Sequence, residues 1–339
     1  MMIIRPSAYT DIDSLYELAG KTGSGLTTLP RDKDLLEAKV EQSLTSFLPE
    51  INGPGLEYYF FVLEDTETGH IAGTSALAST VGLEEAFYNY HLGTTVHTSP
   101  EFNVYNVINT LYLGNDYTGT SEICTLFLEP DYRKDGNGSL LSRSRFLFTA
   151  LHMRRFAPKM IAELRGISDE HGNSPFWDAL GRHFFSMSFE EADALSGEGR
   201  NQFIAELMPK YPIYLPLLPE SAREVIGQVH PNTRPALAML KTEGFEYKNY
   251  VDIFDAGPTV EVLTENIRSV RKSVNYPVVV VEDQALETSF MVANSKIRNF
   301  RCAYIDAAVV DHELHINSRD ADILKVGNGD TVRAYLSRK

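Results

Sequence analysis

The alternation of apolar and polar residues along this chain predicts a series of short strands. Apolar runs bounded by turn residues occupy Met2–Arg5, Tyr58–Leu63, Ile71–Ala78, Ile123–Leu128, Met160–Gly166, Val225–Val229 and Phe245–Phe254. The second and third runs flank a polar turn at 64–69, so we expect them to pair as a hairpin. Residues 82–120 interleave aromatic and polar side chains, which fits either further strands or a substrate-facing segment.

Helical spacing of apolar residues, together with capping residues, predicts helices between these strands. The expected starts are after Thr10, at Ser139, at Ser174-Pro175, and after Asn232 or Thr233. Asp13 lies where it would complete a capping box with Thr10. Gly244 is expected to end the last of these helices, because glycine commonly follows a helix C-terminus.

The chain changes character towards its C-terminus. Residues 259–275 are charged and are interpreted as a linker helix, and residues 276–339 hold several short strand-like runs. We therefore expect a main domain over 1–258, the linker, and a small β-rich, barrel-like domain. Segment 163–184 loosely repeats the layout of 225–258, so it is either a partial second copy of the unit or a coincidence.

Composition and charge limit the classes of partner. The chain has 339 residues, enough for a large core, and a formal net charge of −15, which would repel nucleic acid and anionic membranes. No run approaches membrane-spanning length, and no signal peptide is recognised before Arg5 and Pro6. Cys124 and Cys302 lie far apart in apolar segments, so we expect free thiols and a cytoplasmic location.

One stretch combines a strand, a basic glycine turn and a helix start. Ile123–Leu128 ends at Glu129-Pro130, and the turn Arg133–Gly138 leads into the helix that begins at Ser139. The first N–H groups of a helix lack intrahelical partners, and glycines let a phosphate approach the backbone. The stretch is thus either an ordinary strand-to-helix turn or an anion site. Basic groups for an anionic ligand are supplied by Arg133, Lys134, Arg143 and Arg145.

The spacing Arg-x-x-Gly-x-Gly in this setting resembles the pyrophosphate loop of GCN5-related N-acetyltransferases (GNAT), which bind acyl-coenzyme A. It lacks the Gly-Lys-Ser/Thr ending of nucleoside triphosphatase loops and the glycine spacing of dinucleotide folds. Segments along nearly the whole chain, among them FYNYHLGTTVH, CTLFLEPDYRKDGNG and VIGQVHP, resemble the arginine N-succinyltransferase family. The resemblance implies a GNAT-like acyltransferase fold, a mixed, mostly antiparallel central sheet flanked by helices, with the barrel-like domain after it.

The same resemblance implies transfer of a succinyl group from succinyl-CoA to the α-amine of L-arginine, the first step of arginine catabolism by the succinyl-transfer route. It places a succinyl-CoA contact at Leu126 and the proton-donating histidine at His230. The cofactor-binding residues that we expect are Leu126, Arg133, Lys134, Gly136, Asn137 and Gly138. Succinyl-CoA enters as a co-substrate, and no permanently bound cofactor is expected.

His230 suits proton transfer because an unperturbed imidazole titrates near neutrality. We expect it to protonate the departing CoA thiolate and to be able to relay the amine's proton, whereas the backbone N–H of Leu126 can polarise the thioester carbonyl. The alternative is a structural role, since a histidine before a proline at a strand end often only caps or packs.

Other polar residues leave alternatives open. A guanidinium pairs best with carboxylates, and the candidates are Glu101, Glu163, Asp169 and Glu170. His171 has no second His or Cys at ligand spacing, so we expect no metal. An apolar strand raises a thiol's pKa, which disfavours Cys124 as a nucleophile. We interpret the remaining candidates as structural: His91, His97 and His183.

Three functions remain open at this point. The first is an arginine N-succinyltransferase, or the related subunit that acts on arginine and ornithine. The second is a GNAT enzyme with another acyl donor or amine, and the third is a non-catalytic acyl-CoA-binding subunit. In each case the partners are small molecules, and we expect a homo- or hetero-oligomer.

Overall fold

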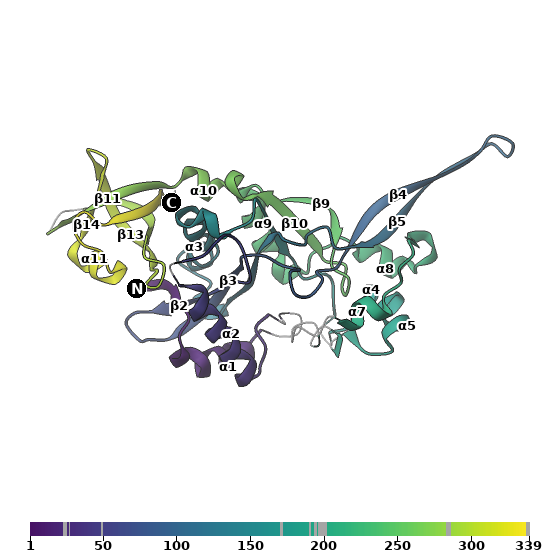
Figure 1. Ribbon diagram of the computed structural model, residues 1–339, viewed down its shortest axis with the longest axis horizontal. Coiled ribbons are helices and arrows are strands. Elements are labelled where there is room, and N and C mark those ends of the chain that lie inside the picture. The colour runs from purple at the N-terminus through teal and green to yellow at the C-terminus, as the bar shows by residue number, and fades with distance from the viewer. Residues whose placement is uncertain are drawn as a thin grey trace.

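A computed structural model of the chain shows one long sheet that is closed into a barrel at the C-terminal end and carries a projecting hairpin at the other end (Figure 1). The structure describes residues 1–22, 26, 28–48, 50–169, 172–189, 191–192, 195, 202–282 and 286–336. Its strands are β1 (Met2–Pro6), β2 (Tyr58–Asp65), β3 (Ile71–Ala78), β4 (Asn89–Ser99), β5 (Val104–Gly114), β6 (Ser121–Leu128), β7 (Lys159–Glu163), β8 (Ile213–Tyr214), β9 (Glu246–Val251), β10 (Pro258–Leu263), β11 (Val274–Val281), β12 (Thr288–Asn294), β13 (Cys302–Val310), β14 (Glu313–Asn317) and β15 (Thr331–Leu336). Its α-helices are α1 (Ile12–Ala19), α2 (Lys33–Ser46), α3 (Asn137–Leu151), α4 (Pro175–Ala179), α5 (Gly181–Phe185), α7 (Gln202–Leu207), α8 (Glu220–Val225), α9 (Arg234–Glu243), α10 (Arg268–Lys272) and α11 (Ser318–Leu324).

The alternating side chains of β2 explain how helices cover both faces of the sheet. Tyr59, Phe61 and Leu63 pack in one buried cluster with Phe146 and Phe148 of α3. The intervening residues of β2 face the other way and pack with apolar residues of α1 and α2. Because successive side chains of a strand point to opposite faces, a fully apolar strand such as β2 indicates a sheet buried on both sides.

The parallel pair β6 and β7 opens the sheet where a ligand can enter. Ser121 pairs with Met160 and Glu122 with Ile161, and no further pairs follow between these two strands. Within β6 the register against β3 also shifts, because Thr74 lies opposite Phe127 while Ala76 lies opposite Cys124. One residue of β3 therefore faces Thr125 and Leu126 of β6, which is a β-bulge. The two strands diverge beyond Glu122.

The expected barrel-like tail is present. Strands β12, β15, β11, β14 and β13 follow one another, and β12 also pairs with β13, which closes the ring. The barrel is joined to the main sheet by β13, which pairs with β1 at Ile3 and Ile4. It also packs on α3, where Tyr304 donates a hydrogen bond to Ser139 at 3.2 Å. The tail therefore shares a buried cluster with the main body.

Two sequence expectations about local structure were wrong. Thr10 does not cap α1; the chain first makes a 3-10 helix at Tyr9–Asp11. The Asp11 carboxylate orders this start, because it accepts the Ala8 N–H at 2.8 Å and pairs with Arg5 at 2.6 Å. The expected strand Val225–Val229 is also absent, since Gly227 has φ +72° and interrupts the extended run.

The expected linker helix over 259–275 was wrong for its first part. Pro258–Leu263 is strand β10, which lies between β7 and β9 in the main sheet. Its charged residue Glu261 pairs with Lys159 of β7 at 3.0 Å. Only Arg268–Lys272 forms an α-helix, α10. The charged residues of this segment therefore did not indicate a linker. Side chains alternate between the two faces of a strand, so a strand within the sheet can carry Glu261 on one face.

The two undecided segments took different forms. Residues 82–120 contain β4 and β5, which pair over their whole length and project from the body (Figure 1). In segment 163–184, helix α5 begins at Gly181, whereas Gly244 ends helix α9 and strand β9 follows it in the segment 225–258.

Candidate functional site

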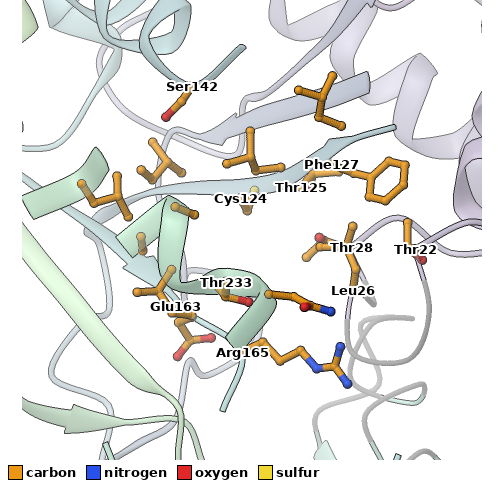
Figure 2. Close-up of a pocket in the computed structure, with 18 of the residues that line it drawn as sticks. Thr22, Leu26, Thr28, Cys124, Thr125, Phe127, Ser142, Glu163, Arg165 and Thr233 are labelled. Carbon is orange, nitrogen blue, oxygen red and sulfur yellow. The ribbon is translucent and has the colours of Figure 1, made fainter. Parts of the chain in front are cut away.

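A cavity of about 530 Å³ lies in the gap between β6 and the end of β7. Figure 2 shows Cys124 and Thr125 of β6 on one side, with Glu163, Arg165 and Thr233 across from them. The cavity reaches the glycine loop through Pro130 and Arg133 and reaches α3 through Ser142 and Arg145. The divergence of the parallel strands therefore creates a site that extends from the loop into the sheet.

At the loop end, the backbone is shaped for a close approach. Gly136 has φ +79°, a conformation that favours glycine, and it immediately precedes α3. A Cβ at Gly138 would meet only Leu128 Cδ2 at 3.8 Å, which is an ordinary contact. The protein itself thus leaves space at Gly138. Asn137 is buried and donates its side-chain amide to the Tyr132 carbonyl at 3.0 Å, so it holds the loop's shape.

The four basic residues of this stretch do not form one cluster. Arg133 is exposed, lines the cavity and donates to the Leu128 carbonyl at 3.0 Å, while Lys134 is exposed beside it. Arg143 instead pairs with buried Glu243 at 2.8 Å and ties α3 to α9. Arg145 lies inside the protein, 2% exposed. The expectation of a single basic cluster was therefore wrong for Arg143, whereas Arg145 lines the same cavity as Arg133 from within the protein.

The bulge places Leu126 on the cavity wall. Thr125 has φ +54°, and its position is held by two side chains of neighbouring strands. Thr74 donates to the Thr125 carbonyl at 3.0 Å, and the Tyr58 and Thr125 hydroxyls lie 2.6 Å apart. Positive φ and an interrupted ladder release backbone groups from the sheet, which the apolar run ICTLFL did not reveal.

The opposite end of the cavity is acidic. Glu163, at the end of β7, accepts a hydrogen bond from Asn89 at 2.7 Å, and Asp252, Asp255 and Glu122 line the same space. Burial and repulsion by Asp252 and Glu122 hold the pKa of Glu163 well above its usual range. Burial likewise raises the pKa of Asp252 and raises that of Glu122 to about 7. Of these four carboxylates, sequence reasoning named only Glu163.

Profiles of two families cover this chain. The one described as arginine N-succinyltransferase beta subunit matches residues 2–269, and the one described as its C-terminal domain matches residues 274–335. The chain is also 50% identical to the arginine N-succinyltransferase of Escherichia fergusonii, with 98% of this chain and 97% of that protein covered. The chain belongs to the arginine N-succinyltransferase family. The expected acyltransferase of this family is thereby confirmed.

Further relatives agree with this family. The arginine N-succinyltransferase of Yersinia pseudotuberculosis is 48% identical, again over 98% of this chain and 97% of that protein. Among solved structures, subunit AI of the Pseudomonas aeruginosa arginine/ornithine succinyltransferase superposes with a TM-score of 0.91 at 37% identity. That superposition covers 100% of this chain and 99% of that chain. Within the described residues, no helix has the length and apolar character needed to cross a membrane.

His230, which we expected to transfer a proton, lies next to the cavity wall. The His230 N–H donates to the Arg165 carbonyl at 2.9 Å, and its Nδ1 accepts the Asn232 N–H at 3.2 Å. Arg165 and Asn232 line the cavity, whereas His230 is not among the lining residues in the described part of the chain. Burial and the positive charge of Arg165 lower the pKa of His230. The ring is therefore neutral at pH 7, with its proton on Nε2.

Most other candidates lie away from the cavity. Glu101 is in the turn of the projecting hairpin, and Asp169 accepts hydrogen bonds from Asn173. His91 packs on Tyr250, and His97 on Tyr214. Glu170 and His171 lie outside the described residues.

Cys124 lines the cavity but is poorly suited to attack. Burial, with a smaller effect of Glu122, raises the pKa of its thiol to about 12. Because the thiolate is the nucleophile, Cys124 stays protonated and unreactive near neutral pH. The thiol is free, as is that of Cys302.

Proposed function

We propose that this chain transfers a succinyl group from succinyl-CoA to the α-amine of L-arginine and releases CoA. The observation that carries the proposal is a single cavity lined both by Arg133, at the start of the basic glycine loop, and by the carboxylates of Glu163, Asp252 and Asp255. The anionic acyl donor, succinyl-CoA, suits the basic end of the cavity. The cationic acyl acceptor, arginine, suits the acidic end. The amine attacks the thioester carbonyl, the C–N bond forms, the C–S bond breaks, and the amine's proton ends on the sulfur.

The pyrophosphate of CoA binds at the start of α3 in this proposal. The first amides of a helix lack intrahelical partners and favour an anion, and Gly138 leaves them accessible. Arg133 and Lys134 add positive charge at the same place. Two features support a GNAT-like fold for the part of the chain from β6 to β9. Strand β6 is followed by the loop and α3, and the segment ends with helix α9 and strand β9.

The thioester carbonyl lies at the bulge of β6. Thr125 and Leu126 together lie opposite one residue of β3, and a backbone N–H at this bulge can stabilise the oxyanion that forms during attack. Leu126 lines the cavity at this point. A donor that is already positioned needs no reorganisation during the reaction.

The guanidinium of arginine binds at the acidic end. Asp252 and Asp255 disfavour ionisation of Glu163 in the free protein, and a planar cation offsets that repulsion while pairing with carboxylates. Ornithine is the second candidate acceptor, because the solved relative at 37% identity is an arginine/ornithine succinyltransferase subunit. Its ammonium would meet the same carboxylates.

The experiment is release of free CoA thiol with arginine, ornithine or lysine as acceptor and succinyl-CoA or acetyl-CoA as donor. We expect succinyl-CoA with arginine to give the highest kcat/KM. Faster turnover with acetyl-CoA would contradict the proposed donor. Release with none of the combinations would leave a non-catalytic acyl-CoA-binding subunit.

A further inference from the structure

Arg145 is a buried cation with no counter-ion among the residues that the structure describes. It lies in the middle of α3 and is 2% exposed, yet no described Asp or Glu forms an ion pair with it. Burial lowers the pKa of its guanidinium to about 10. A buried charge without an anion is costly, so an arginine kept in this position indicates an anion that arrives with a ligand.

The hydrogen bonds of Arg145 leave part of its fork unused. Nε donates to the Ser142 carbonyl at 3.1 Å, Nη1 to the Cys124 carbonyl at 3.3 Å, and Nη2 to Ser142 Oγ at 3.2 Å. A guanidinium has five N–H groups. Three are used here, and the remaining two, one on each terminal nitrogen, have no acceptor among the described residues. These two positions suit a carboxylate, which an arginine binds in bidentate fashion.

The cavity connects this guanidinium to the reacting bond. Arg145 and Ser142 line the same space as Leu126 and the bulge, and Arg145 is bonded to the carbonyl of Cys124, two residues before Leu126. An extended succinyl group reaches about 4 Å from carbonyl carbon to carboxyl carbon over three bonds of about 1.5 Å. Its two ends can therefore both lie in the space that Leu126 and Arg145 line.

We propose that Arg145 binds the free carboxylate of the succinyl group and thereby selects a dicarboxylic acyl donor over a monocarboxylic one. The inference rests on the proposed function and names the residue that recognises its donor. Arg165 is the competing cation on the cavity wall. It already donates to Ser168 Oγ at 2.6 Å, is only half-buried, and follows β7 beside the acidic end.

The test compares succinyl-CoA with butyryl-CoA, in which a methyl group replaces the carboxylate. Arg145→Met keeps the length of the side chain and removes its charge. We expect the ratio of kcat/KM for succinyl-CoA over butyryl-CoA to fall roughly 10- to 100-fold, the worth of hydrogen bonds to a charged group, while turnover of butyryl-CoA is kept. Arg143→Met is the matched control on the same helix, because Arg143 pairs with Glu243 outside the cavity, and its ratio should stay unchanged.

The outcomes separate this inference from the proposed function. If the unmodified enzyme releases no CoA from succinyl-CoA with arginine, the proposed function fails. If it does, but Arg145→Met keeps the full preference for succinyl-CoA, only the role of Arg145 is overturned. Should Arg145→Met fail to fold, a crystal structure of the unmodified enzyme with succinyl-CoA decides. A carboxylate within hydrogen-bonding distance of the Arg145 terminal nitrogens supports the inference, and a carboxylate on Arg165 overturns it.

Discussion

Glu163 and His230 both have surroundings that favour their neutral forms. Glu163 is buried near other carboxylates, which raises its pKa, and His230 is partly buried beside Arg165, which lowers its pKa. A cation that binds beside a neutral carboxylic acid favours its ionisation. A neutral imidazole can donate a hydrogen bond from Nε2 without carrying charge. Each residue gives a prediction that depends on this state.

Arginine binding should release a proton from Glu163. The raised pKa favours the protonated form of Glu163 in the free enzyme, whereas a bound guanidinium favours the carboxylate, so affinity should rise with pH towards the free-state pKa. Calorimetric titration with arginine in buffers of different ionisation enthalpy measures the proton. Glu163→Gln should abolish the release and weaken binding by roughly 1.5–3 kcal/mol. Proton-free, pH-independent binding would remove Glu163 from the arginine site.

His230 should act through Nε2. Because Nδ1 accepts the Asn232 N–H, His230→Asn can keep that backbone contact with its amide oxygen while losing the Nε2 position. If the Nε2–H of His230 donates a hydrogen bond to the departing sulfur, both His230→Ala and His230→Asn should lower kcat by roughly 10²–10³ with little change in CoA affinity. Near-normal kcat in His230→Asn, with a loss only in His230→Ala, would make this histidine a structural cap.

At the scale of elements, two glycines at the start of α3 have different roles. Gly138→Val should weaken CoA binding by roughly 1.5–3 kcal/mol or more, because the side chain fills space that the protein leaves open for the pyrophosphate. Its unfolding temperature should change little. Gly136→Ala is the contrast, since φ +79° strains any Cβ, and it should lower stability as well. Unchanged CoA affinity in Gly138→Val would move the phosphate site elsewhere.

The segment that joins main body and barrel is packed rather than free. The backbone N–H of Ser269 donates to buried Glu243 at 2.7 Å, and Arg333 of the barrel donates to the Val270 carbonyl at 2.8 Å. The two family matches meet between residues 269 and 274. The boundary between the two family matches therefore falls in a segment whose backbone is hydrogen-bonded to both the main body and the barrel.

Trypsin should accordingly spare α10 in the native protein, although Arg268, Arg271 and Lys272 are exposed there. A protease needs several residues of extended backbone, and opening this helix breaks its bonds to Glu243 and Arg333. Mass spectrometry of a short digest checks this. Rapid cleavage after these residues, releasing a folded barrel, would instead support a separable domain over residues 276–339.

At the scale of the whole molecule, the hairpin of β4 and β5 extends far from the body (Figure 1). Its apolar residues include Phe102, 72% exposed, and Tyr105, 70% exposed. A two-stranded ribbon is only marginally stable alone in water, and exposed aromatic groups of this kind mark contact surfaces. We propose that the hairpin packs on a second copy of this chain.

Replacing Phe102 and Tyr105 with serine should shift the protein towards monomers by removing that contact. Size-exclusion chromatography with light scattering measures the mass. Val310→Ser, on the barrel and 44% exposed, is the control and should leave the mass unchanged. A monomeric unmodified protein, or variants that remain fully associated, would contradict the role of the hairpin.

Sequence patterns predicted those features that depend on neighbouring residues. The apolar runs of β2 and β3, the basic glycine turn before α3 and the stop at Gly244 all follow from local preferences, and the structure contains each of them. The strand-rich tail likewise indicated a barrel. Local patterns failed where a distant contact decided the conformation, as at Asp11, whose carboxylate is held by Arg5, and at Gly227, whose N–H bonds to the Ala256 carbonyl.

The cavity shows the same division. Its loop could be read from residues 133–138, because a phosphate site at a helix N-terminus is built from consecutive residues. The acidic end could not be predicted from the sequence. Glu163 lies at the end of β7 and Asp252 and Asp255 follow β9, and only the pairing of β7, β10 and β9 brings them together. The sequence showed Arg145 only as one of four basic groups available to an anionic ligand. Only the packing of α3 over β6 buries it, and burial without a counter-ion is what gives that residue a ligand to bind.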